Sequence, residues 1–153
     1  MSQISCHSMR DVVAFAIDRE EKAKQFYTQC AEKAKQPGIK QFFQDMAQEE
    51  ERHRQLLTDL DPQALESFES HPPEDLKLSD FLVDVKFTPD ITYQQALTMA
   101  MKKEEKAHAF YQAWEGKCSN EKTSKVFALL AEEELKHKRK IEEIYDSEIL
   151  TWD

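Results

Sequence analysis

Two short motifs in the sequence place a carboxylate and an imidazole one helical turn apart, Glu50-x-x-His53 and Glu134-x-x-His137. Carboxylate oxygens and imidazole nitrogens are common metal ligands, so each motif can bind one metal ion. Taken singly, such a pair is more often solvated on a helix surface. Two further glutamates, Glu20 and Glu104, each precede the glutamate of one motif by 30 residues and complete two matching sets.

The spacing of 30 residues suits two antiparallel helices joined by a short turn. A chain that follows one helix for about 30 Å and returns along the next brings residues this far apart to similar height. Two such hairpins facing each other would bring four carboxylates and two imidazoles together, and four carboxylates balance the charge of two divalent cations. The sequence therefore predicts a two-metal site formed by Glu20, Glu50, His53, Glu104, Glu134 and His137.

An internal repeat relates the two halves of the chain at an offset of 84 residues, without any gap. The segment Glu-Glu-Lys-Ala occurs at 20–23 and again at 104–107, and Phe-Tyr occurs at 26–27 and again at 110–111. Each copy has apolar residues at helical spacing on both sides of one break. Each copy is therefore predicted to form a helical hairpin.

The helix boundaries follow from capping and helix-breaking residues. The first copy is expected to begin at Ser8, to break at Pro37-Gly38 and to end near residue 60. The second copy is expected to begin at Thr92, with Gln95 completing a capping box, and to end near residue 146. Residues 61–91 hold four prolines and predict a long connection whose apolar residues pack on the helices. We expect a single all-α domain over residues 1–153, a four-helix bundle from two helical hairpins joined by one long crossover.

The amino-acid composition agrees with this fold and argues against two classes of partner, nucleic acids and membranes. The 153 residues include only two Gly and five Pro, and 33% are charged, which favours long helices. A net charge of -9 repels nucleic acid phosphates, so we expect no nucleic acid partner. No apolar run approaches the roughly 20 residues that cross a bilayer, and residues 1–13 lack a secretory apolar segment. We expect no membrane partner and a cytoplasmic protein.

The three cysteines, Cys6, Cys30 and Cys118, form no Cys-x-x-Cys pair. We therefore expect no disulfide framework and no rubredoxin-type iron site or zinc ribbon, which need closely paired thiolates. In the predicted topology the first and third helices are antiparallel, which separates Cys30 from Cys118 by on the order of 35 Å.

The repeated pattern resembles the rubrerythrin branch of the ferritin-like superfamily. The resemblance rests on Ala-x-x-x-Glu-x-x-Ala-x-x-Phe-Tyr at 16–27 and 100–111, and on Ala-x-Glu-Glu-x-x-His at 47–53 and 131–137. It implies two iron ions per chain, with Mn or Zn also accepted by such ligands. By the resemblance Glu50 and Glu134 bridge the two metals, and the other four residues each bind one metal.

Two departures from the family pattern change the expected site. Rubrerythrin-type proteins often carry a further metal-binding Glu where this chain has Ala107, so we expect a symmetric six-ligand site. Many also carry a fused rubredoxin domain, and here we expect an external electron donor such as a rubredoxin. Tyr27 and Tyr111 lie two turns beyond Glu20 and Glu104, where each can hydrogen-bond a ligand carboxylate or pack in the core.

The remaining polar residues near the motifs are expected to be peripheral. His108 has no histidine at its repeat counterpart and is expected not to bind the metals. The neighbouring glutamates are expected to form solvated helix faces: Glu49, Glu51, Glu105, Glu132 and Glu133.

The resemblance favours a non-haem di-iron redox protein that reduces hydrogen peroxide or dioxygen, and we expect a homodimer. Iron oxidation and storage, or oxygenation of an organic substrate, would use the same site and stay open alternatives. A metal-free helical interaction module would leave the two matched ligand sets unexplained.

Overall fold

Four long helices, paired into two hairpins, form the computed structural model, which describes residues 9–60, 63, 69, 71–118 and 121–150. The helices are α1 (Met9–Lys33), α2 (Pro37–Thr58), α4 (Tyr93–Lys117) and α5 (Glu121–Tyr145). Short helical turns lie at η1 (Leu78–Phe81) and η2 (Asp146–Leu150). No strand occurs in these described ranges, so the predicted all-α bundle is confirmed.

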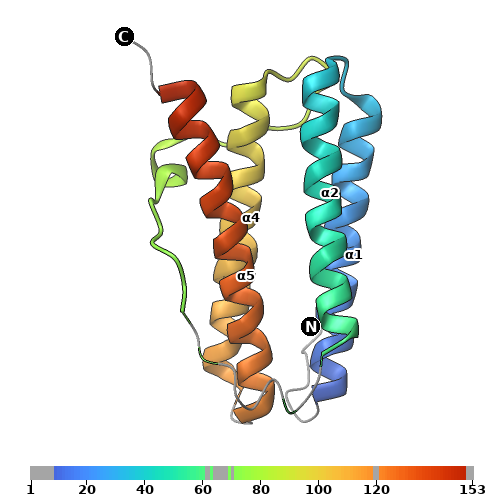
Figure 1. Ribbon diagram of the computed structural model, residues 1–153, viewed down its shortest axis with the longest axis vertical. Helices are drawn as coiled ribbons and strands as arrows, with labels where there is room; N and C mark the ends of the chain where they lie inside the picture. The colour runs from blue at the N-terminus through green and yellow to red at the C-terminus, as the bar shows by residue number, and fades with distance from the viewer. Residues whose placement is uncertain (1–8, 61–62, 64–68, 70, 119–120, 151–153) are drawn as a thin grey trace.

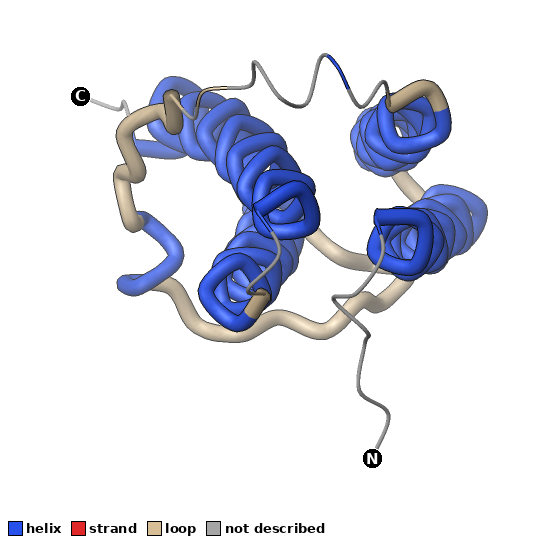
Figure 2. Tube along the Cα trace, turned by 90° about the horizontal axis from the view of Figure 1, so that it is seen from below, coloured by secondary structure: helices blue, strands red, loops and turns tan. Residues whose placement is uncertain are grey.

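The two hairpins lie side by side, α1 with α2 and α4 with α5 (Figures 1 and 2). Helices α2 and α4 run in the same direction, so the connection between them must travel the length of the bundle. It does so along the outside of the α4–α5 hairpin (Figure 1). This is the predicted single-crossover topology, in which α1 and α4 are antiparallel. Among the described residues no helix is long and apolar enough to cross a bilayer.

The helix boundaries agree with the sequence signals, with one shift. Thr92 caps α4, and its side chain and that of Gln95 exchange the two hydrogen bonds of the predicted capping box. Pro37 does not lie between the first two helices but occupies the first turn of α2, with Gln36 as the capping residue. Proline suits this position because the first turn of a helix needs no amide donor. The predicted start at Ser8 lies outside the described residues.

The core consists of two apolar clusters, one toward each end of the bundle. One contains Phe43, Leu97 and Ile141 among other buried residues, and the second contains Val12 and Phe127. Crossover residues of the predicted set, Leu78, Leu82 and Val85, pack against the first cluster. Between the clusters the bundle centre is lined by polar side chains.

A buried lysine ties the crossover to the bundle. The Lys138 side chain on α5 is 1% exposed, and its Nζ lies 2.7 Å from Asp75 Oδ1 in the crossover and 2.8 Å from Glu105 Oε2 on α4. Glu142, also buried, accepts the backbone N–H of Leu78 at 3.1 Å. The lysine lowers the pKa of both Asp75 and Glu105 against the opposing effect of their burial. These contacts hold the middle of the crossover against the α4–α5 hairpin.

One cysteine expectation is wrong. Cys118, at the end of α4, is disulfide-bonded, whereas Cys30 is a free buried thiol. Cysteines far apart in a sequence can meet through the fold, which spacing alone does not reveal. Cys30 and Cys118 are not bonded to each other, as the antiparallel arrangement of α1 and α4 requires.

Replacing the buried lysine will destabilise the fold. Lys138→Met leaves Glu105 and Glu142 without their cation, and removing one partner of a buried ion pair typically costs about 3–5 kcal/mol. Urea denaturation of the metal-free protein measures the change in the free energy of unfolding. The control is Lys22→Met, because Lys22 pairs with Asp18 on an exposed helix face and such a pair contributes about 1 kcal/mol or less. Equal losses in the two variants would contradict a structural role for Lys138.

Candidate metal centre

The structure brings the six predicted ligand residues together in the centre of the bundle. Each is at most 4% exposed. Their ligand atoms form two groups, each with all its atoms within 4.8 Å of one another: Glu20, Glu50, His53 and Glu134 in one, and Glu50, Glu104, Glu134 and His137 in the other. Glu50 and Glu134 belong to both groups, and each group has one imidazole and three carboxylates.

The repeat explains why the two groups match. Glu20 and Glu104 lie near the middle of α1 and α4, and the Glu-x-x-His motifs lie on the returning helices α2 and α5. A glutamate and a histidine three residues apart point to the same side of a helix, so each motif directs both ligands inward. Because the two hairpins carry the same residues at equivalent heights, their facing surfaces build one two-fold arrangement.

The carboxylate oxygens and imidazole nitrogens of the six residues lie close to one another, but several of them form no hydrogen bond. His53 Nδ1 lies 3.5 Å from Glu134 Oε1 and 3.6 Å from Glu20 Oε2, and His137 Nδ1 lies 3.4 Å from Glu104 Oε1. The two Nδ1 atoms and Glu104 Oε2 are buried and have no hydrogen-bond partner. Buried polar atoms are normally satisfied, so these orphaned atoms fit a site whose missing partners are cations. The donor set of carboxylates and imidazoles suits iron or manganese.

Electrostatics in the protein alone oppose full ionisation of the four carboxylates. Burial, together with the neighbouring carboxylates, raises the pKa of Glu50, Glu104 and Glu134 well above the ordinary value. Burial also acts on Glu20, but its contacts with Glu50 and His53 outweigh it and lower the pKa of Glu20 to about 2. Two divalent cations would replace the protons that otherwise limit this repulsion.

Two buried tyrosines link the hairpins through the ligand carboxylates. Tyr27 on α1 donates from its hydroxyl to Glu104 Oε1 on α4 at 3.5 Å, and Tyr111 on α4 donates to Glu20 Oε1 on α1 at 3.2 Å. Each tyrosine therefore hydrogen-bonds the glutamate of the opposite copy of the repeat. Burial is the main cause that raises the pKa of both hydroxyls, so they stay protonated donors.

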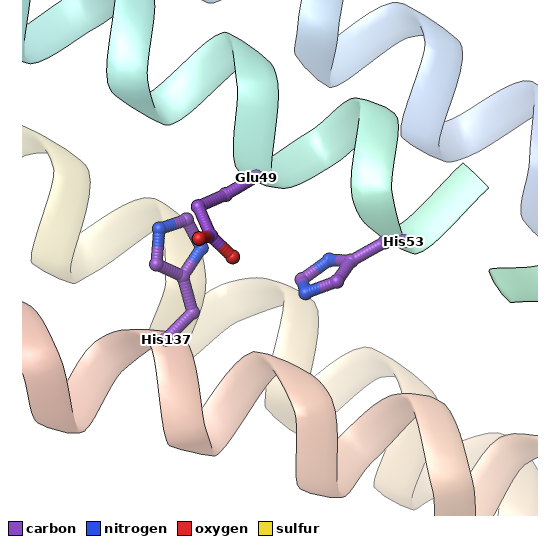
Figure 3. A group of neighbouring side chains, drawn as sticks. All are labelled: Glu49, His53 and His137. Carbon is purple, nitrogen blue, oxygen red and sulfur yellow. The ribbon is translucent and has the colours of Figure 1, made fainter. Parts of the chain in front are cut away.

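Two glutamates that were expected on solvated helix faces, Glu49 and Glu133, lie beside the two imidazoles. Figure 3 shows the side chains of His53 and His137 extending from α2 and α5 with the carboxylate of Glu49 beside them, and the two rings are perpendicular, with centroids 5.8 Å apart. Glu133, the repeat counterpart of Glu49, lies 3.9 Å from His53 Nε2, which has no hydrogen-bond partner. An imidazole that binds metal through Nδ1 carries its proton on Nε2 and needs an acceptor there. Glu133 is placed to be that acceptor.

On the side of α1 and α4 a cavity of about 270 Å³ opens onto the carboxylates. Ala23 and Ala107 line it next to Glu20 and Glu104, so small side chains leave space beside the predicted ligands. The remaining wall is formed by aromatic rings and by three cations: Phe26, Tyr27, Tyr111, Arg19, Lys103 and Lys106.

Several residues near the centre are more buried than the sequence predicts. Glu132 and Glu133 are buried, 5% and 9% exposed, so the expected solvated face is wrong at these positions. Glu105 is half-buried against Lys138. A signal for Lys138 existed in the sequence, since it lies one turn from Glu134 and from Ile141 on the inward stripe of α5. His108 belongs to neither ligand group, and its Nδ1 lies 2.8 Å from the backbone oxygen of Ala131.

Removing the negative charge of Glu133 near His53 Nε2 will weaken metal binding without removing a ligand. We expect Glu133→Gln to lower the affinity for a divalent metal by about tenfold or more, as changes behind a metal-bound histidine typically do. Competition with a chromophoric chelator measures the affinity. Glu143→Gln is the matched control, because Glu143 lies on an exposed turn of α5 and pairs only with Arg139. An unchanged affinity in Glu133→Gln would show that metal binding by His53 does not need the negative charge of Glu133.

Comparison with known proteins assigns the chain to a family. No curated protein and no solved structure matches it. The model of the rubrerythrin family matches residues 11–75 and 95–151, which include both hairpins and all six residues of the centre. Since this match spans well over half of the sequence, the chain belongs to the rubrerythrin family.

Proposed function

We propose that this chain is a di-iron oxidoreductase that reduces hydrogen peroxide or dioxygen with electrons from an external donor. Membership of the rubrerythrin family and the buried carboxylate–histidine groups support a di-iron carboxylate protein. In the proposal Glu20 and His53 would bind one iron, and Glu104 and His137 would bind the second. Glu50 and Glu134 would bind both. Iron held in this way would supply two one-electron steps between Fe(II) and Fe(III).

The observation that carries the proposal is the sharing of Glu50 and Glu134 between the two ligand groups. Glu50 and Glu134 would therefore help to hold both metal ions when the site is loaded. Ions held by shared carboxylates would be close enough to act together on one small molecule, as a two-electron reduction requires. The cavity beside Ala23 and Ala107 gives such a molecule access from the side away from the histidines.

The protein's own groups would position the site and deliver protons. Tyr27 and Tyr111 hold the carboxylates of Glu104 and Glu20 through their hydroxyls, which restricts rotation of these two ligands. Both hydroxyls lie on the wall of the cavity and carry a proton at neutral pH. Each hydroxyl has only one proton, so a hydroxyl that donates to a bound oxidant would first release its ligand carboxylate. The aromatic and alanine side chains around them limit the water next to the carboxylates.

Removing a proposed bridge will change the number of metals bound. We expect Glu50→Ala to bind fewer than two metal ions per chain, because it removes an oxygen from both groups. Elemental analysis after anaerobic Fe(II) loading and desalting measures the stoichiometry. Glu121→Gln is the control and should match the unmodified protein, since Glu121 is 86% exposed at the start of α5. Two tightly bound metals in Glu50→Ala would refute the bridging assignment.

The oxidant can be identified by stopped-flow mixing of the Fe(II)-loaded protein. We expect rapid oxidation of both irons by hydrogen peroxide, slower oxidation by dioxygen, and repeated turnover when a reductant is supplied. Absorbance changes and peroxide consumption are the two readouts, and the metal-free protein is the blank. A protein that loads two irons but responds to neither oxidant would exclude the redox function while leaving the metal site intact.

A further inference from the structure

The cavity above the carboxylates is larger than the oxidants of the proposed function require. Its volume is about 270 Å³. A water molecule needs roughly 10–15 Å³ of accessible cavity volume, and pockets for small organic ligands begin at roughly 300 Å³. Hydrogen peroxide and dioxygen have two heavy atoms each and would occupy a small part of this space. The cavity therefore has room for an organic group.

Three cations surround the cavity, in a protein whose net charge is -9. Lys103 and Lys106 are exposed at its rim, and Arg19 is half-buried in its wall. Within the described part of the chain none of the three forms an ion pair with a carboxylate, whereas most surface lysines and arginines elsewhere in that part do. Arg19 Nε is buried and has no hydrogen-bond partner. A buried donor without an acceptor indicates a place for an anionic ligand.

Aromatic rings hold two of these cations in place. The Arg19 guanidinium lies 3.7 Å from the centre of the Phe110 ring, and Lys103 Nζ lies 4.0 Å from the centre of the Phe26 ring. Such contacts attract a cation while leaving its remaining N–H groups free to donate. The cavity thus combines an apolar wall, unpaired positive charge at the opening and the four predicted ligand carboxylates at its base. Positive charge does not attract hydrogen peroxide or dioxygen, because both are neutral.

We propose that the cavity binds a small organic hydroperoxide that carries a carboxylate, with Arg19, Lys103 and Lys106 contacting the carboxylate. The alkyl chain would lie along Phe26, Ala23 and Ala107, and the hydroperoxide would reach Glu20 and Glu104 at the base. This substrate class rests on the proposed function. Reduction breaks the O–O bond with two electrons and two protons and yields an alcohol and water. The electrons come from two Fe(II) ions, which become Fe(III), and the external donor restores them.

Binding is tested first without turnover, with Zn(II)-loaded protein and calorimetric titration of hexanoate and of its neutral analogue hexanol. We expect hexanoate to bind more tightly than hexanol, and Lys103→Gln/Lys106→Gln to weaken hexanoate binding by about tenfold, in line with two exposed charge contacts. Arg19→Gln should weaken it as well. The control is Lys35→Gln/Lys140→Gln, which removes the same charge from two exposed lysines that do not line the cavity. Absence of hexanoate binding, or an equal loss in both double variants, would overturn the proposal.

Turnover of the Fe(II)-loaded protein then identifies the substrate. We expect a higher kcat/KM for a hydroperoxyhexanoate than for hexyl hydroperoxide, and an increase in KM for the first compound in Lys103→Gln/Lys106→Gln. Consumption of hydrogen peroxide should fall less in this variant than consumption of the hydroperoxyhexanoate. A parallel fall with all three peroxides would contradict the carboxylate contact. Loss of activity toward every peroxide in the unmodified protein would instead refute the proposed redox function, whatever the titration gives.

Discussion

The structure depends on one electrostatic constraint, the burial of four carboxylates at the centre of the bundle. Glu20, Glu50, Glu104 and Glu134 are each 2% exposed, and burial together with their mutual repulsion raises the pKa of Glu50, Glu104 and Glu134. Burying a charge without a partner costs several kcal/mol, so the arrangement needs either protons or cations. The two apolar clusters toward the ends of the bundle supply stability that the polar centre does not provide.

In a second buried cluster of carboxylates, the negative charge is balanced by a lysine of the chain itself. Asp75, Glu105 and Glu142 gather around Lys138, whose charge is permanent and whose ammonium group reaches Asp75 and Glu105 within hydrogen-bond distance. This cluster joins the crossover to α4 and α5 and has a structural role. The central cluster has two imidazoles and no lysine. Its charge has to be balanced by protons or by ions from outside, as in a candidate binding site and unlike a structural ion pair.

The two sides of the centre have different chemistry because they belong to different helix pairs. Helices α2 and α5 carry the histidines, and the glutamates behind them can orient the rings. Helices α1 and α4 carry the tyrosines and the small residues Ala23 and Ala107 beside the cavity. The crossed hydrogen bonds from Tyr27 to Glu104 and from Tyr111 to Glu20 connect the two repeat copies. Metal retention and access by small molecules are thereby assigned to opposite faces of one bundle.

The sequence by itself determined the helices, their pairing and the six central residues, because a gapless repeat and helical periodicity can be recognised without knowledge of the fold. The Thr92 capping box and the position of the crossover followed from the same kind of signal. Only the tertiary structure decided which charges meet. Lys138 pairs with Asp75 from a distant segment, Glu133 is buried rather than solvated, and Cys118 is in a disulfide. Arg19 and Lys103 reach one cavity because antiparallel helices bring distant turns together, and no sequence spacing encodes that meeting.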